Sequence, residues 1–479
     1  MTAQFAKTHS DADSKLLHSL KEAIVESGLE SGMTVSFHHH LRNGDYVLNM
    51  VMDEIAELGI RDLTVNASSI FDVHEPLIKH IQSGVVKKLE CNYMGAKVGR
   101  FISEGGMSEP VTFRTHGGRA GDIMRGASPI DVAFIAAPCA DKRGNLTGKR
   151  GPSACGSLGY AMADAECADK VIAVTDYLDD YPLADYSICE TKVDYVVKVD
   201  KIGDPKGIVS GTTRITRDPM GLLMAQYATE IIELSGLLQD GLSFQTGAGG
   251  ASLAVAAYLK QKMLDKKIVG SFGMGGITSY LVDMLNEGCF QSLMDVQCFD
   301  LGAVGSIREN PKHREISAEH YASPFAPSAL TNSLDVVILG ATQVDLDFNV
   351  NVHTDSSGYI MGGSGGHSDT ASGAKLAMIV APLIRARMPL IVDRVQCIST
   401  PGSTVDVVVT AQGIAVNPRR AELIGELKAA HLPVFSIEEL KAFAEDLTGA
   451  PKALPRREQT VAEVLYRDGK LIDTISSVR

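Results

Sequence analysis

The stretch from Gly362 to Lys375, GGSGGHSDTASGAK, combines residue types that could do acyl chemistry. Its glycine-rich start supplies free backbone amides, and His367 follows directly, before a helix-like run. Clustered amides can form a nest that holds an anion, or the oxyanion that develops when a thioester is attacked. We therefore predict that Gly365 and Gly366 are catalytic through their amides, and that His367 donates a hydrogen bond to the oxyanion or to the substrate.

The same loop formally matches the GxSxG pattern of a serine-hydrolase nucleophile elbow, with Ser364 at its centre. An elbow needs a strand directly before the serine and a triad gathered from distant segments. Here SSGYIM precedes the loop, and His367 follows the serine within the same loop. We therefore favour an amide cradle and count Ser364 as a substrate-binding candidate. Asp369 is a catalytic candidate that could orient His367 or cap the following helix, and the sequence leaves both roles open.

Two further glycine segments each follow a strand-like run and precede a helix-like run. They are TGAGGASLAVAAYLKQKM from Thr246 and GSFGMGGITSYLVDML from Gly270. Glycine amides at a helix N-terminus can hold a phosphate or an oxyanion. The first segment does not match GxGxxG, because Ser252 stands in place of the third glycine, so a dinucleotide site is disfavoured. The alternative for this segment is a tight turn that needs glycine. The catalytic candidates are Gly249 and Gly250, and the substrate-binding candidates are Gly247, Gly275 and Gly276.

Two loops that follow predicted strands carry basic residues. They read SFHHHLRNGD from Ser36 and THGGRAGD from Thr115. Adjacent histidines in an extended segment point to opposite sides, so the three cannot simply share one metal, and we predict no metal site. A guanidinium group suits a carboxylate. We therefore count His38, Arg42 and Arg119 as substrate-binding candidates, while a structural salt bridge stays equally open for each arginine.

The elements that must position these residues alternate between strand and helix. Short apolar runs such as MTVSF, DLTVNAS, DVAFIAAP and KIVGSF are separated by helical periodicity, as in DYVLNMVMDEIAELG. This alternation predicts an α/β fold with mostly parallel sheets covered by helices. A chain of 479 residues is too long for one core. A Gly-, Pro- and Thr-rich break at residues 203–219 suggests two domains, residues 1–215 and 216–479.

An internal similarity links the two halves. DVAFIAAPCADKRGN starts at Asp131 and DVVILGATQVDLDFN at Asp335, and both carry Asp and Asn at the same spacing after the strand. Coincidence between two similar strands is one interpretation. The other is a duplicated α/β domain, which would place a site between the two halves.

The amino-acid composition disfavours several classes of partner and cellular location. The chain is 45% hydrophobic and 22% charged, as in a globular protein, and its net charge of −13 disfavours nucleic acid and anionic membrane as partners. The eight cysteines form no CxxC pair, which favours free thiols in a reducing compartment. The N-terminus lacks a secretory apolar segment and no run is long enough to span a bilayer. We expect a cytoplasmic protein.

Taken together, seven segments resemble the α subunit of bacterial citrate lyase, a citrate CoA-transferase, from about residue 20 to the C-terminus. They are VSFHHHLRNGD, FQTGAGGASLAV, GGITSYLVDML, DVQCFD, FNVNV, GGSGGHSDTASGAK and PGSTVDVVVTAQGIAVNP. The resemblance implies two tandem CoA-transferase-like α/β domains. It also implies exchange of acetyl for citryl on an acyl-carrier or CoA thioester, with acetate released.

The resemblance further implies partners but no covalently bound cofactor. These partners are a β subunit that cleaves the citryl thioester and a γ acyl carrier with a phosphoribosyl-dephospho-CoA arm, in a complex that contains several copies of this chain. The thioester, on CoA or on that arm, is a substrate.

One departure bears on mechanism. Many CoA-transferases use a glutamate nucleophile near the segment that IVGSFGMGG resembles, and here Met274 stands among glycines instead. This favours direct attack by the citrate carboxylate through a mixed anhydride, although Glu104, Glu109 and Glu309 stay open as nucleophiles. A sibling transferase for another acid, an acyl-CoA thioesterase and a non-catalytic scaffold for the carrier are the alternative functions.

Overall fold

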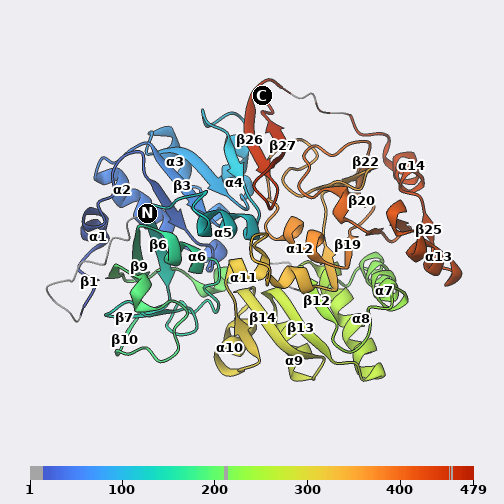
Figure 1. Ribbon diagram of the computed structural model, residues 1–479. Coiled ribbons are helices and arrows are strands. Elements are labelled where there is room, and N and C mark those ends of the chain that lie inside the picture. The colour runs from blue at the N-terminus through green and yellow to red at the C-terminus, as the bar shows by residue number, and fades with distance from the viewer. Residues whose placement is uncertain (1–13, 210–213, 453, 455–456) are drawn as a thin grey trace.

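The computed structural model describes residues 14–209, 214–452, 454 and 457–479. The chain forms an α/β structure with one large, mostly parallel sheet in each half, as the sequence predicts. Figure 1 shows the first half in blue to green and the second half in light green through yellow to red.

The first sheet has ten strands, and only its last pair is antiparallel. In spatial order they are β1 (Leu16–Leu17), β11 (Tyr195–Lys198), β9 (Lys170–Thr175), β6 (Val132–Ala137), β2 (Thr34–Phe37), β3 (Leu63–Ala67), β4 (Val86–Cys91), β5 (Val111–Phe113), β26 (Thr460–Leu465) and β27 (Leu471–Ser476).

The second sheet has nine strands, and all its pairs are parallel except β23 with β24. In spatial order they are β15 (His313–Glu315), β14 (Phe290–Cys298), β13 (Gly270–Ile277), β12 (Ser243–Thr246), β16 (Val336–Leu339), β19 (Leu376–Val380), β23 (Val407–Val409), β24 (Ile414–Val416) and β25 (Val434–Phe435).

Three small sheets lie beside the large ones. They are β10 (Leu178–Asp179) with β7 (Cys139–Asp141) and β8 (Leu146–Thr147), β18 (Val350–Asn351) with β17 (Gln343–Asp345) and β22 (Ile391–Val392), and β20 (Ile384–Arg385) with β21 (Met388–Pro389). The apolar run MPLIVDRVQCIS predicts a strand, but it forms only the short strands β21 and β22.

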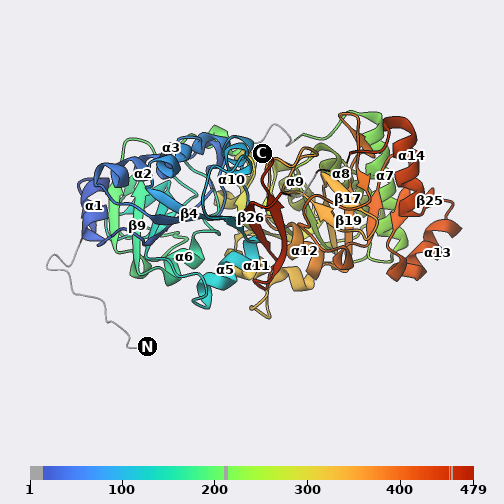
Figure 2. The same cartoon turned by 90° about the horizontal axis from the view of Figure 1, so that it is seen from above.

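Helices cover both faces of the first sheet, with α2 and α3 on one side and α5 and α6 on the other (Figure 2). The α-helices of the described chain are α1 (Leu20–Glu26), α2 (Val47–Glu57), α3 (Leu77–Gln82), α4 (Ala96–Ser103), α5 (His116–Met124), α6 (Met162–Cys167), α7 (Pro219–Leu234), α8 (Gly250–Lys266), α9 (Ser279–Asn286), α10 (Leu301–Glu309), α11 (Ala318–Ala322), α12 (His367–Gly373), α13 (Ala421–Ala429) and α14 (Ile437–Thr448).

The central strands are apolar on both faces because helices cover both. β6 reads VAFIAA and β19 reads LAMIV, and both are buried at every position, as expected in a parallel sheet between two helical layers. Six of the eight cysteines are buried. The helical periodicity after Thr246 predicts a buried face of Leu253, Ala256, Ala257 and Leu264. On α8, Leu253 and Ala256 are buried, but Ala257 is only half-buried and Leu264 is 39% exposed.

The two halves repeat one topology. The order β9-β6-β2-β3-β4 in the first sheet corresponds to β19-β16-β12-β13-β14 in the second. The matching aspartates do the same job, because Asp131 accepts a hydrogen bond from the Thr34 amide (2.6 Å) and Asp335 accepts one from the Ser243 amide (2.8 Å). Each aspartate thus joins its strand to the first central strand of its half.

The loops after these strands are also repeated. Asp141 accepts a hydrogen bond from the Asn145 side chain (2.8 Å), and Asp345 accepts one from the Asn349 side chain (3.2 Å). Each aspartate also accepts backbone amide bonds from its own loop. The shared spacing in the sequence therefore reflects a duplicated domain and not a coincidence.

A hairpin at the C-terminus crosses back to the first half. β26 pairs with β5, and β27 completes the hairpin, so both strands extend the first sheet. In Figures 1 and 2 this hairpin lies between the two halves. The segment REQTVAEVLYRDGKLIDTISSVR predicts a helix-like start followed by a hairpin with RDGK as its turn. The hairpin is confirmed, but its start is a strand from Thr460. The division at residue 215 falls between the large sheets, yet the last strands of the range 216–479 belong to the first sheet.

The expected glycine turn after β13 is absent. The strand continues through Gly275 and Gly276 to Ile277, with an irregular register between the two glycines, and α9 follows at once. Glycine is needed at these positions for close packing, because a Cβ on Gly276 would lie 2.2 Å from the ring of Phe299.

Candidate active site

The carboxyl ends of the two sheets meet between the halves. The side-chain amide of Gln297, in β14, donates a hydrogen bond to the backbone oxygen of His39, which follows β2 (2.8 Å). Gly365 lies in a parallel bridge beside Thr115, which follows β5. Open α/β sheets bind ligands at their carboxyl ends, so this junction is the expected place for a site.

Four aromatic rings from the first half gather at this junction, and we call His39, Phe71, His116 and Tyr160 the aromatic cluster. The His39 ring lies 4.5 Å from the Tyr160 ring and 5.5 Å from the His116 ring, measured between centroids. His116 lies 4.4 Å from Tyr160. The Nδ1 atom of His39 hydrogen-bonds the Ser68 hydroxyl (2.6 Å), which fixes the orientation of the ring.

The histidines of the aromatic cluster are neutral at physiological pH. Burial lowers the pKa of His116 to about 3, and Arg119 adds to this effect. Burial likewise lowers the pKa of His39 well below its usual value. Among the described residues, the buried Nδ1 of His116 has no hydrogen-bond partner. A neutral imidazole with a free nitrogen can therefore accept or donate one hydrogen bond to a ligand.

The guanidinium group of Arg42 lies at the same junction. Its backbone has φ of +52°, and its guanidinium lies 4.7 Å from the Phe299 ring centre and 5.4 Å from that of Phe71. These two rings come from different halves. The buried Nη1 has no hydrogen-bond partner in the described part of the chain. Aromatic faces hold the cation in place without using its donors, so those donors are free for a carboxylate.

The second half contributes a hydroxyl and an amide. Gln245 donates a hydrogen bond from Nε2 to the hydroxyl of Tyr321 (2.9 Å). Two predicted glycines leave room for this pair: a Cβ on Gly275 would lie 2.8 Å from the Gln245 side chain, and one on Gly366 would lie 2.4 Å from the Tyr321 hydroxyl. Burial raises the pKa of Tyr321, so its hydroxyl keeps its proton.

Backbone hydrogen bonds join the glycine loop, residues 362–366, to the first half. The His116 amide donates to the Gly365 oxygen (2.9 Å), and the Gly365 amide donates to the Asn92 oxygen (3.1 Å). The amide of His367 donates to the oxygen of Ser364 (2.8 Å), and Ser364 itself is buried. The Gly365 amide, which is predicted to be catalytic, is therefore already used, and the loop connects the two halves.

Both ring nitrogens of His367 are hydrogen-bonded within the protein. Its Nε2 bonds the Gly340 oxygen (2.9 Å) and its Nδ1 bonds the Thr400 hydroxyl (2.7 Å). Burial lowers its pKa to about 4, so the ring is neutral and donates from Nε2 to the carbonyl. Both nitrogens are occupied, which argues against the predicted role as oxyanion donor.

Asp369 plays neither of the roles expected for it. Its carboxylate accepts from the Thr115 hydroxyl (2.8 Å) and from the Gly117 amide (2.9 Å), and both belong to the start of α5. No described bond joins it to His367, and α12 has no side-chain cap. Asp369 therefore caps a helix of the other half.

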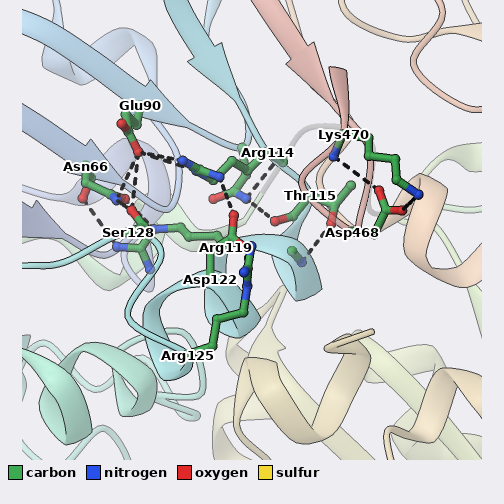
Figure 3. A network of polar contacts seen from close by, with 12 residues as sticks. Asn66, Glu90, Arg114, Thr115, Arg119, Asp122, Arg125, Ser128, Asp468 and Lys470 are labelled. Atoms are coloured by element: carbon green, nitrogen blue, oxygen red, sulfur yellow. Dashed lines mark hydrogen bonds and ion pairs between the residues drawn. The ribbon is translucent and has the colours of Figure 1, made fainter. Parts of the chain in front are cut away.

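His38 and Arg119 lie in a buried cluster beneath the junction. His38 Nε2 lies 3.0 Å from Asp164, and Arg119 forms a two-pronged pair with the same carboxylate (2.7 and 2.9 Å). Arg119 also bonds Asn66, as Figure 3 shows beside the separate pairs of Arg114 with Glu90 and Asp122. Burial alone would raise the pKa of Asp164, but Arg119 and His38 outweigh it and keep the carboxylate ionised. Arg119 therefore forms the structural salt bridge that the sequence left open as an alternative to substrate binding. The side chain of His38 is fully buried beside the same carboxylate.

The first glycine segment lies at the edge of the same site. The Gly247 amide donates to the Ile338 oxygen in β16, two residues before the carbonyl that binds His367. Gly249 is the N-cap of α8, and Gly250 begins the helix. Gly247 and Gly249 are exposed, and a Cβ on either would meet nothing closer than 3.8 Å. Their cradle role stays a prediction, with an open helix N-terminus in its favour.

A model of the family described as citrate lyase, alpha subunit (CitF), matches residues 13–478. The chain belongs to the citrate lyase α-subunit family. The resemblance seen in the sequence is thereby confirmed, and the chain is an enzyme subunit of the CoA-transferase type.

Relatives of this family cover almost the whole chain. The citrate lyase alpha chain of Klebsiella pneumoniae is 49% identical over 465 residues, or 97% of this chain and 92% of the relative. A crystal structure described as an alpha subunit of citrate lyase from Streptococcus mutans, in complex with citrate, shares 49% identity and a TM-score of 0.96 over 99% of this chain and 93% of that one.

An acyl-CoA transferase from Escherichia coli O157:H7 is only 15% identical, with a TM-score of 0.60 over 85% of this chain and 88% of that one. This similarity shows the fold alone.

The glutamates left open as nucleophiles have other contacts. Glu104 pairs with Arg100 and Arg479, and Glu309 pairs with Arg308 at the end of α10. Glu109 is exposed in the loop before β5. No described contact brings any of the three to the aromatic cluster.

Sequence reasoning missed most of the side chains that the citrate lyase α-subunit fold gathers here, namely His39, His116, Tyr160, Gln245 and Tyr321. A signal existed for three of them. Neighbouring residues in an extended segment face opposite ways, so His39 faces away from the stacked rings of His38 and His40 and toward Tyr160. His116 lies beside Thr115 in the segment chosen for Arg119. Gln245 directly precedes the glycine segment that starts at Thr246, while Tyr160 and Tyr321 lie in runs without a distinctive pattern.

Proposed function

We propose that this chain is a citrate:acyl-thioester transferase, which exchanges the acetyl group of a CoA-type thioester for citryl and releases acetate. Arg42 carries the proposal: its guanidinium lies between aromatic rings of both halves, with a buried Nη1 that no described residue pairs. The protein has a net charge of −13, so a polycarboxylate needs such a local cation to bind. The S. mutans relative in complex with citrate supports the same substrate.

The proposed reaction has two steps and needs no enzyme nucleophile. In the first step, a citrate carboxylate oxygen attacks the acetyl carbonyl and the C–S bond breaks. The thiolate is the leaving group, and the product is a mixed acetyl–citryl anhydride. The thiolate then attacks the citryl carbonyl of that anhydride, the C–O bond breaks, and acetate leaves with the oxygen that citrate supplied. No net proton is taken up or released, so the enzyme mainly positions the reactants and stabilises charge.

The described side chains suit these tasks. Arg42 binds one citrate carboxylate and brings it to the junction. The protonated Tyr321 hydroxyl, held by Gln245, donates to the thioester oxygen as it becomes an oxyanion. Neutral His116 offers its free Nδ1 to a citrate hydroxyl or carboxyl group. The open N-terminus of α8 at Gly249 receives a phosphate of the CoA-type arm.

The natural thioester is proposed to be carried by a γ acyl-carrier subunit with a phosphoribosyl-dephospho-CoA arm, and the product to pass to a β subunit for cleavage. The family name, an α chain, supports membership of a complex. No helix within the described ranges combines the length and apolar character needed to cross a membrane.

Mass spectrometry of the purified chain with acetyl-CoA and citrate tests the proposal. We expect citryl-CoA and acetate in equal amounts. Hydrolysis of acetyl-CoA without any acid would indicate a thioesterase, and transfer to another acid but not to citrate would indicate a sibling transferase. If free CoA esters give no reaction, the assay is repeated with the acyl carrier, and a second failure contradicts the proposal.

A further inference from the structure

We propose that Arg467, carried by the turn of the C-terminal hairpin, is a positioning residue of this site: it holds Asp369 against the start of α5 and so keeps His116 and the glycine loop aligned. The inference rests on the proposed function for its activity readout only.

The hairpin turn places Arg467 among elements of the second half. Its Nη2 donates to the Ala322 oxygen of α11 (3.0 Å), and its Nη1 donates to the Ser372 hydroxyl of α12 (3.3 Å). Its Nε lies 3.6 Å from Asp369, as an ion-pair contact without the alignment of a hydrogen bond. A residue of the first sheet is thus anchored in two helices of the other half.

Asp369 connects Arg467 to the start of α5. The carboxylate accepts from the Gly117 amide and from the Thr115 hydroxyl, and Thr115 in turn caps the helix at Gly118 (2.8 Å). A negative charge is favourable at a helix N-terminus, where amides lack partners. The ionised form of Asp369 therefore fixes the first turn of α5.

The first turn of α5 carries the site residue His116. The amide of His116 donates to the Gly365 oxygen, and a Cβ on Gly365 would lie 3.2 Å from the His116 ring. Movement of the turn by a few tenths of an ångström would therefore displace both the imidazole and the glycine loop. Displacements of this size at a site reduce the rate of the chemical step more than they reduce substrate binding.

The positive charge of Arg467 also affects the ionisation of Asp369. Burial raises the pKa of Asp369 to about 6, and Arg467 opposes that rise. Among the described residues, Tyr160 and Tyr321 also interact electrostatically with the carboxylate, and both keep their protons. Arg467 is the cation among these residues that favours ionisation of Asp369. Without it, Asp369 would be protonated closer to neutral pH and would lose its charge at the α5 terminus.

The test compares Arg467→Gln, Arg467→Lys and Asp369→Asn in the full chain. Lys470→Gln is the matched control, because Lys470 lies on the same turn, is 82% exposed and pairs only with its neighbour Asp468 in the described contacts (Figure 3). We measure kcat, KM for citrate, and melting temperature from about pH 5 to about pH 8.5, a range that brackets the relevant ionisation.

For Arg467→Gln we expect kcat to fall about tenfold or more with KM within about threefold, and the acid limb of kcat to move up by roughly one pH unit. Arg467→Lys should restore part of kcat and part of the original position of the acid limb, and Lys470→Gln should match the wild type. Unchanged kcat and acid limb in Arg467→Gln would overturn the proposal, as would a lower melting temperature with unchanged kinetics.

A readout without activity separates this inference from the proposed function. The raised pKa of Asp369 means that its ionisation disfavours the folded state, so the wild type loses stability relative to Asp369→Asn as pH rises from about 4 to about 6. In the Arg467→Gln background the upper end of this window should move to higher pH, because only the folded-state pKa of Asp369 changes. If the wild type transfers no acyl group, the proposed function is wrong, but the pH dependence of stability still tests the role of Arg467. An upper end that stays at the same pH overturns that role.

Discussion

Gln245 and Tyr321 meet in the second half through a 2.9 Å hydrogen bond, and two glycines, Gly275 and Gly366, pack so closely on this pair that neither could carry a side chain without displacing it. The pair lies next to the loop that the first half holds through His116 and Asn92. Glycine is required here by the approach of side chains, and only in part by backbone conformation.

The variant Gly366→Ala tests the importance of this packing. Its Cβ would lie 2.4 Å from the Tyr321 hydroxyl, so we expect kcat to fall about tenfold or more as the hydroxyl moves. Tyr321→Phe, which removes the hydroxyl donor, should cost about tenfold by itself. In the double variant the losses should be less than additive, because the clash is relieved. Additive losses in kcat would contradict this account of Gly366.

Arg42→Gln should weaken citrate binding. We expect KM for citrate to rise about 100-fold and kcat to change less, because the lost interaction binds the substrate as well as the transition state. Arg42→Lys should recover part of this. Arg143→Gln is the control, since Arg143 also lies over an aromatic ring, Tyr181 at 4.8 Å, but in the small sheet of the first half. Equal effects of the two substitutions on KM would rule out a specific role for Arg42.

Arg119 should behave differently from Arg42. Breaking its buried pair with Asp164 leaves an uncompensated charge, so Arg119→Gln should reduce the free energy of unfolding by about 3–5 kcal/mol. Urea unfolding of Arg119→Gln, Asp164→Asn and the double variant measures this, and the double variant should lose less than the sum. A rise in KM for citrate at unchanged stability would restore Arg119 as a ligand.

His367 should make the fold sensitive to acid. Its pKa is about 4 in the folded chain, below the usual value of 6.5, so the unfolded chain binds the proton first as pH falls. The folded state therefore loses stability between about pH 6.5 and about pH 4, by on the order of 2–3 kcal/mol. His367→Gln should lose less over this window, and His18→Gln, at an exposed position, should follow the wild type. Parallel curves for wild type and His367→Gln would show that this burial has no such effect.

The sequence predicts the layers of this fold well, because strands buried on both faces leave continuous apolar runs such as VAFIAA and because duplication repeats the Asp131 and Asp335 pattern. It places Arg42, Gly275, Gly276, Gly365 and Gly366 at the junction for a related reason, since polar and glycine residues after parallel strands gather at one edge.

The sequence does not predict contacts between residues that are far apart in the chain. Asp369 looks like a partner for its neighbour His367, yet it caps α5 from 252 residues away. Arg119 and Arg42 look equivalent as cations after strands, but Asp164 neutralises only the first. These choices depend on which side chains tertiary packing brings together, and no local pattern encodes that. The partners of the C-terminal hairpin are hidden for the same reason.

A single-turnover experiment with oxygen-18 in the citrate carboxylates tests the central claim most directly. The enzyme is mixed in excess with acetyl thioester and labelled citrate, and the acetate released is analysed by mass spectrometry. Direct attack predicts one labelled oxygen in the acetate of the first turnover, because the citrate oxygen leaves with it. Unlabelled acetate together with citryl thioester would indicate a carboxylate of the enzyme as nucleophile, and unlabelled acetate without citryl thioester would indicate hydrolysis. Either result would contradict direct transfer to citrate.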